Sequence, residues 1–150
     1  MSDVAPAELT ELELAAWRGF LGTHAALIKA LDAQLESAHG LPLTTYEVLV
    51  TLYHAPGRRL RMAELAEHAF LSRSGVTRLV DRLERDGLLR RELCSSDARG
   101  CFATLTEEGE ALLATARPTH LDGVRRLFLS RLSRDDLEHL ARIWDLIRSD

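Results

Sequence analysis

Apolar side chains recur at helical spacing in the middle of the chain, where Val76, Leu79, Val80 and Leu83 predict one buried helical face. A serine at position 72 is a good N-cap, because its hydroxyl can accept a hydrogen bond from an orphan backbone N–H. Past the last turn, a glycine at position 87 tolerates the left-handed conformation that ends a helix. The side chains left facing outward are short polar groups and charged residues: Arg73, Ser74, Thr77, Arg78, Asp81, Arg82 and Arg85. This outer face suits DNA, since arginine reaches guanine edges or phosphates and Ser or Thr bonds either.

The residues on both sides of this helix predict a winged helix-turn-helix. A short helix after residue 61 precedes it, and the apolar period changes to that of strands over residues 88–94 and 101–105. Residues 95–100 between the strands are rich in turn formers. Arg99, near the tip of this hairpin, suits a narrow minor groove, where the negative potential is enhanced, and Asp97 can hold it in place. The alternative is a solvated hairpin with ordinary charges.

Two helical patterns precede this central module. Thr10 with Glu13 forms a capping-box signature that opens a helix to about Ser37. Its apolar residues alternate spacings of three and four, as in a coiled-coil seam: Leu14, Trp17, Leu21, His24, Ile28, Leu31 and Leu35. After a break at 40–42, a second capping box of Thr44 with Glu47 predicts a helix that ends at 56–57.

Two further helices follow the hairpin. Thr106 is expected to cap the first, in which Pro118 should kink the helix or briefly break it. Ser133 with Asp136 opens the last one. The terminal helices carry apolar faces too wide for one small chain to cover, so we expect a homodimer. The expected fold class is mainly α with a small β-hairpin wing, as one intertwined unit: an N-terminal dimerisation helix (1–40), a winged module (41–106) and C-terminal dimerisation helices (107–150).

Charge is distributed unevenly along the chain. The 150 residues carry a net charge of −4, but the segment 58–101 holds ten arginines against seven acidic residues, a balance of +3. A basic central module between acidic arms is typical of a protein that meets DNA with one face. No apolar run is long enough to span a membrane and no signal peptide is evident, so we expect a cytoplasmic protein. The sequence contains no phosphate-cradling glycine loop, nucleophile elbow or metal-binding His-Glu helix motif, which argues against an enzyme and predicts no cofactor and no metal site.

These segments together resemble the MarR (multiple antibiotic resistance regulator) family of bacterial transcription factors over nearly the whole chain. The resemblance is carried by LTTYEVLVTL at 43–52, MAELAEHAFLSRSGVTRLVDRLERDGLLRR at 62–91 and SDARGCFATLTEEG at 96–109. It implies a dimer on a pseudo-palindromic DNA operator, with recognition helices in successive major grooves and wings in the flanking minor grooves. The residues it implicates in DNA binding are Ser72, Arg73, Ser74, Thr77 and Arg78, with Arg82 on the same face, and Asp97 with Arg99 in the wing. It also implies a repressor that a small phenol or aromatic carboxylate releases.

The residues that would bind such an effector are less defined. Trp17 and His24 lie one heptad apart on the first helix, with Arg18 beside them. An arginine and a histidine can bind a carboxylate while a tryptophan stacks on an aromatic ring. Tyr46 and Tyr53 on the next helix are weaker candidates. The alternative is that Trp17 and His24 are core or dimer-seam residues and that Arg18 is solvated.

Two other hypotheses stay open. Cys94 and Cys101 stand at the facing ends of the two wing strands, where a disulfide formed on oxidation would move Arg99 and act as a redox switch. The alternative for the cysteines is a pair of small, half-buried thiols. A winged helix can also be a protein-interaction module, a function that sequence-specific, salt-sensitive DNA binding would exclude.

Overall fold

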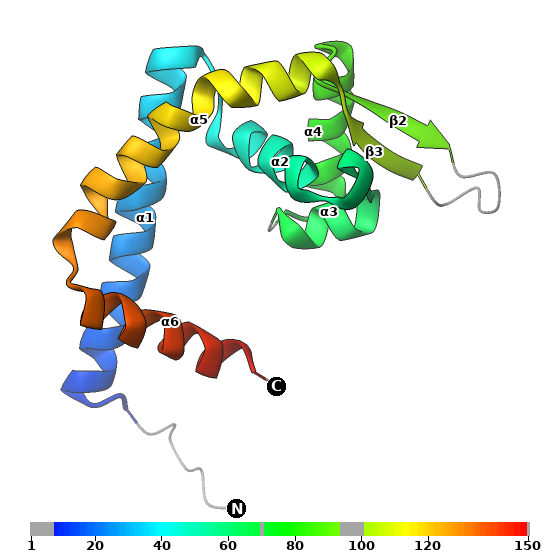
Figure 1. Ribbon diagram of the computed structural model, residues 1–150. Helices are drawn as coiled ribbons and strands as arrows, with labels where there is room; N and C mark the ends of the chain where they lie inside the picture. The colour runs from blue at the N-terminus through cyan, green and yellow to red at the C-terminus, as the bar shows by residue number, and fades with distance from the viewer. Residues whose placement is uncertain (1–7, 70, 94–100, 150) are drawn as a thin grey trace, which may run out of the picture.

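A computed structural model describes residues 8–69, 71–93 and 101–149 as a mainly α-helical chain with one small sheet (Figure 1). The elements in chain order are α1 (Glu11–His39), α2 (Leu43–His54), η1 (Pro56–Arg58), β1 (Arg59–Arg61), α3 (Met62–His68), α4 (Arg73–Arg85), β2 (Leu89–Leu93), β3 (Cys101–Leu105), α5 (Glu107–Leu127), η2 (Leu129–Arg131) and α6 (Arg134–Arg148). This arrangement confirms the predicted fold class. No helix in the described part of the chain is both long and apolar enough to cross a membrane.

The first helix begins and ends where its local signals predict. The Thr10 hydroxyl accepts a hydrogen bond from the Glu13 N–H at 3.2 Å, and the Glu13 carboxylate accepts one from the Thr10 N–H at 2.8 Å. The Thr10 N–H and the Thr10 hydroxyl both donate to the Glu13 carboxylate and lower its pKa, because they stabilise its charged form. Gly40 follows the helix at φ 62°, a left-handed conformation that costs glycine little.

The second helix begins differently from the prediction. α2 starts at Leu43, and Pro42 at its N-cap position makes no side-chain cap bond. The predicted capping box of Thr44 and Glu47 was wrong, because a residue of another helix satisfies this end: the Asp32 carboxylate of α1 accepts from the Leu43 N–H at 2.8 Å. A capping group that lies eleven residues earlier in the chain leaves no local signature.

The sheet contains one more strand than the expected hairpin. β3 lies between β1 and β2 and pairs antiparallel with both, so that Arg61 and Glu92 flank Phe102. The helix-turn-helix of α3 and α4 precedes the hairpin, and Ser72 caps α4 as predicted by accepting from the Gly75 N–H at 3.1 Å.

The start of α5 is fitted closely against the turn before β2. The Thr106 hydroxyl accepts from the Gly109 N–H at 3.1 Å and donates to the Gly87 carbonyl at 2.6 Å. A Cβ on Gly109 would lie 2.1 Å from the Leu88 carbonyl oxygen, far inside van der Waals contact. The segment from Leu105 to Gly109 therefore joins β3 to α5 through the Thr106 cap and the close approach of Gly109 to the Leu88 backbone.

α5 continues through Pro118, so the break, one of the two predicted effects of this proline, does not occur, and the kink stays a prediction. Proline removes the hydrogen bond to the carbonyl four residues earlier, that of Ala114. Both residues are exposed, so water can hydrate that carbonyl and the helix continues.

The hydrophobic core and the exposed apolar faces lie at opposite ends of the molecule. Leu49, Leu52, Val80 and Leu113 are completely or almost completely buried where α2, α4 and α5 meet the sheet. The other end consists of α1, the second half of α5 and α6, which crosses the lower part of α1 in Figure 1. Large apolar side chains are exposed there on α1 and α6: Leu12, Trp17, Phe20, Leu21, Ile28, Ile143, Trp144, Leu146 and Ile147. A single chain leaves these faces uncovered.

Candidate DNA-binding interface

α4 presents a polar face over its first two turns. Ser72, Arg73, Ser74, Thr77 and Arg78 are all exposed, as is Arg82 one turn further on. The opposite face is buried as predicted, through Val76, Leu79, Val80 and Leu83. The apolar period thus orients the whole candidate set of α4 toward one side.

The three hydroxyl groups of this face differ in what they can offer DNA. The Ser72 oxygen caps the helix and lies 3.3 Å from the Ser74 oxygen, so the two hydroxyls share a hydrogen bond. The Thr77 hydroxyl donates to the Arg73 carbonyl at 2.9 Å. Because its proton is used within the helix, Thr77 is left with acceptor lone pairs and a methyl group that can contact a thymine methyl.

The arginines of this face have no acidic partner in the part of the chain that the structure describes. Within residues 8–69, 71–93 and 101–149, no carboxylate forms an ion pair with Arg73, Arg78 or Arg82. Three guanidinium groups on successive turns can therefore reach phosphates or guanine edges without first losing a partner.

A single arginine of β2 fixes α4 against the sheet. The Arg91 guanidinium lies 2.6 Å from the Asp81 carboxylate and donates to the Thr77 carbonyl at 3.3 Å. The Arg91 backbone N–H donates to the Glu84 carboxylate at 2.7 Å. We call these four residues the Arg91 bracket. It holds α4 and β2 in one relative position.

The outer face of the sheet carries basic residues that sequence reasoning did not single out. Arg59 and Arg61 place their guanidinium groups 4.7 Å and 5.0 Å from the centre of the Phe102 ring. Arg59 and Arg90 both lie near the Glu92 carboxylate, at 3.4 Å and 3.3 Å. The signal was available only in the pairing of β1 with β3, which brings together residues about forty positions apart.

The wing tip lies outside the described residues. The predictions for Asp97, Arg99 and Cys94 fall there and stay predictions. Cys101 is half-buried at the start of β3, and its thiol lies 3.7 Å from the Phe102 carbonyl. The redox hypothesis is not tested by this contact alone.

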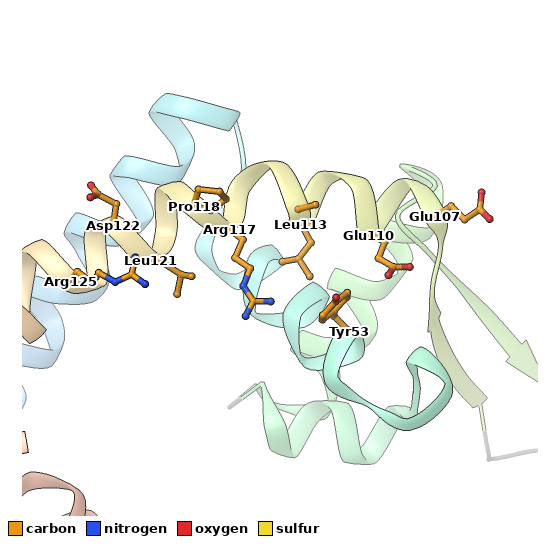
Figure 2. Close-up of a pocket in the computed structure, with 10 residues that line it drawn as sticks. Tyr53, Glu107, Glu110, Leu113, Arg117, Pro118, Leu121, Asp122 and Arg125 are labelled. Carbon is orange, nitrogen blue, oxygen red and sulfur yellow. The ribbon is translucent and has the colours of Figure 1, made fainter. Parts of the chain in front are cut away.

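A pocket of about 960 Å³ opens between α2 and α5, at the upper end of the size range for small-molecule sites. Tyr53 of α2 lies beneath α5 in Figure 2, and the side chains of Arg117 and Glu110 extend from α5 toward that side. Its lining is apolar at Leu113, Ala114, Pro118 and Leu121 and charged at Glu107, Glu110, Arg117, Asp122 and Arg125. The lining has three carboxylates and two guanidinium groups, so an anion would have to bind beside Arg117 or Arg125 and away from the acidic side chains.

Of the five residues that the sequence suggested for the effector, Tyr53 lines this pocket, whereas Trp17, Arg18, His24 and Tyr46 do not. The ring centres of Trp17 and His24 each lie 6.2 Å from the ring centre of Phe20 on α1. The Phe20 ring centre lies 5.6 Å from that of Trp144 on α6. Arg18 is exposed on the same helix. These residues belong to the exposed apolar end of the molecule, so the structure does not bring Trp17, Arg18 and His24 together with Tyr46.

Tyr46 is buried, with 3% of its surface exposed, and its ring centre lies 4.3 Å from that of His120 on α5. Burial raises the pKa of the Tyr46 phenol and lowers the pKa of the His120 imidazole, because it disfavours the charged form of each. Nearby, the His39 imidazole and the Thr119 hydroxyl are 2.8 Å apart. These pairs join α1, α2 and α5 where the winged module meets the terminal helices.

Comparison with known proteins agrees with the class that this geometry defines, a winged helix-turn-helix DNA-binding protein. A sequence model of the MarR family matches residues 39–100. The transcriptional regulator HosA of Escherichia coli O157:H7 is 37% identical over 108 residues, which are 70% of this chain and 78% of HosA. The regulator MhqR of Bacillus subtilis is 34% identical over 67% of each chain.

Solved structures show the same relationship over almost the full length. Sco3205, a MarR family transcriptional regulator of Streptomyces coelicolor solved in complex with DNA, is 40% identical. The match has a TM-score of 0.89 and covers 97% of this chain and 91% of Sco3205. The chain belongs to the MarR family of transcriptional regulators, whose members regulate transcription and are not enzymes.

Proposed function

We propose that this chain is a repressor that binds a pseudo-palindromic operator as a homodimer and releases it when a small aromatic anion binds between α2 and α5. The observation that carries the DNA-binding part is the α4 face, where Arg73, Arg78 and Arg82 are free of described carboxylates. The similarity to Sco3205, which was solved in complex with DNA, supports it.

Each residue of α4 has a distinct role in this proposal. Arg78, in the second turn of the helix, contacts a base edge in the major groove, while Arg73 and Arg82 bind phosphates. Ser72 and Ser74, at the start of the helix, form hydrogen bonds with DNA phosphates. Asp97 and Arg99 of the wing keep their proposed role in the minor groove.

The exposed apolar faces of α1 and α6 support dimerisation. Trp144 and Phe20 already contact each other within one chain, and Leu146 and Ile147 beyond them are 64% and 70% exposed. Soluble monomers rarely expose large contiguous apolar patches, and where they do, the patch usually marks an interaction site. We assign Trp17, Leu21 and Ile28 to the same interface, with 1–40 and 107–150 as the dimerisation segments and 41–106 as the DNA-binding module.

Apart from Tyr53, the pocket between α2 and α5 favours different effector contacts from those expected from the sequence. Leu113 and Leu121 supply apolar walls, and the Tyr53 ring supplies an aromatic face. Arg117 and Arg125 supply positive charge locally, although Glu107, Glu110 and Asp122 also line the pocket. An aromatic carboxylate or a phenol matches this combination. We therefore place the effector beside Tyr53 and Arg117, and Trp17 and His24 in the dimer seam.

Selection of bound fragments from genomic DNA by the purified full chain identifies the operator, and fluorescence anisotropy measures its affinity. Arg78→Ala should weaken discrimination between operator and scrambled DNA by roughly 1–3 kcal/mol if the residue reads a base. Arg134→Ala is the matched control, since Arg134 is an exposed arginine on α6 that pairs with Glu138. If the selection enriches no sequence, the proposal that this chain binds a specific operator is refuted, and a protein-interaction module becomes the favoured function. If the protein still binds the operator in the presence of every aromatic acid and phenol of a test panel, the proposal that such a molecule releases DNA is refuted.

A further inference from the structure

Arg58 occupies an unusual backbone position between α2 and β1. Its φ of 58° is the only positive value among the described residues other than glycine. The left-handed region is unfavourable for a residue with a Cβ, so surrounding contacts must hold it there. Strained positions of this kind occur at functional sites more often than elsewhere.

The Arg58 side chain supplies those contacts. Its guanidinium stacks over the Tyr53 ring, with its central carbon 3.8 Å from the ring centre, and donates to the Tyr53 backbone carbonyl. Its Nη2 lies 3.5 Å from the Glu110 carboxylate of α5. Tyr53 and Glu110 both line the pocket between α2 and α5, where Figure 2 shows them on its two sides. Arg58 thus borders the proposed effector site while it lies on the turn that leads into the sheet.

We propose that Arg58 is the residue through which the pocket acts on the DNA-binding module: a small carboxylate in the pocket takes the Arg58 guanidinium away from Glu110. This inference rests on the proposed effector function. The pair with Glu110 is easily exchanged because both side chains are about 40% exposed and meet through one contact. A planar carboxylate can accept two parallel N–H bonds from the guanidinium and so competes well.

The residues that follow Arg58 carry the change to the DNA-binding surface. Arg59 and Arg61 of β1 pair with Thr104 and Phe102 of β3, and β3 is also the partner of β2 in the wing. The Arg61 backbone N–H is held by Glu64 at the start of α3. A shift at residue 58 therefore reaches both the wing and the helix-turn-helix within three residues of chain.

The first test needs no ligand. Glu110→Gln removes the carboxylate that holds Arg58, so hydrogen exchange of the backbone amides of residues 59–61 should quicken about two- to fivefold, the range expected for one exposed ion pair. Glu108→Gln is the matched control: Glu108 lies in the same acidic first turn of α5 but does not line the pocket. Equal exchange in Glu110→Gln and the wild type would overturn the link between α5 and β1.

The second test uses 2-hydroxybenzoate as the probe, with calorimetry for its binding and anisotropy for DNA affinity. Removing the competing carboxylate in Glu110→Gln should tighten probe binding about two- to fivefold. Arg58→Gly, which keeps the left-handed backbone without strain, should weaken probe binding and leave DNA affinity unresponsive to the probe. Thermal unfolding of Arg58→Gly checks that this variant folds. Arg58→Lys keeps the positive charge but loses the planar guanidinium, so its DNA affinity should fall only partly when the probe is added.

The outcomes separate the two proposals. If the wild type does not bind 2-hydroxybenzoate, the aromatic-carboxylate part of the proposed function fails, whereas the exchange measurement still decides whether Glu110 restrains β1 through Arg58. If the wild type binds the probe and Arg58→Gly releases DNA equally well, the effector function stands and the role of Arg58 is refuted.

Discussion

Arg91→Ala tests whether the relative position of α4 and the wing contributes to DNA binding. The substitution removes the ion pair with Asp81 and the hydrogen bond to the Thr77 carbonyl, but keeps the backbone bond from residue 91 to Glu84. It therefore loosens one side of the Arg91 bracket and leaves the strand itself in place.

The expected loss follows from those two contacts. A partly exposed ion pair contributes about 0.2–1 kcal/mol and a hydrogen bond to a carbonyl about 0.5–1.5 kcal/mol, so the two together contribute about 0.7–2.5 kcal/mol, with a central value of about 1–2 kcal/mol. For a chain of this length that corresponds to a fall in Tm of about 2–8 °C. Specific DNA affinity should fall by up to about tenfold, because binding must then supply the ordering that Arg91 provided.

Thermal unfolding at several protein concentrations and anisotropy on the selected operator measure the two effects. Concentration must be varied because the stability of a dimer depends on it. Arg90→Ala is the control: Arg90 neighbours Arg91 but pairs only with Glu92 among the described acidic residues. Equal Tm values and DNA affinities for the two variants would refute the bracket.

Three other substitutions test separate features. Gly109→Ala should lower Tm strongly, since its Cβ would lie 2.1 Å from the Leu88 carbonyl oxygen; an unchanged unfolding curve would contradict this packing. Burial raises the pKa of Glu47 above its ordinary value of 4.5, so the folded state loses stability as pH rises above that value. Glu47→Gln should therefore raise Tm at pH 7.5 but not at pH 4, and an equal gain at both would show another cause. Arg82→Ala should reduce the slope of log affinity against log salt by about 0.9 if Arg82 grips a phosphate, and a constant slope would exclude that contact.

Local signals in the sequence predicted the ends of several helices because the groups that cap them are close in the chain. Ser72 and Thr106 accept hydrogen bonds from N–H groups three residues later, and Gly40 adopts a left-handed conformation itself. The periodicity of α4 likewise fixed which side chains face outward. The candidate residues of α4 were therefore accessible from the sequence.

Features that depend on distant partners were missed. β1 has three residues and forms only by pairing with β3, and the start of α2 is capped by Asp32 of another helix. The sequence did not predict the pocket for the same reason, because Tyr53 and Arg117 come together only through the packing of α2 against α5.

The first helix shows a second limit of sequence patterns. A repeat of three and four residues identified the seam that contains Trp17 and His24, but such a repeat does not say whether the seam faces a ligand, the same chain or a second copy. Phe20 and Trp144 show that part of it faces α6. The effector assignment for Trp17 and His24 relied on residue type alone.

α5 has the geometry of a lever arm. Its 21 residues span about 32 Å. Gly109 contacts Leu88 near one end, and about 21 Å further along the helix Gly123 packs against Leu31 of α1. A tilt of about 5° at the α1 end displaces the other end by about 3 Å, close to the rise of one base pair. In the proposed dimer, a small rearrangement among the terminal helices would therefore change the distance between the two recognition helices, which has to match the half-site spacing of the proposed operator.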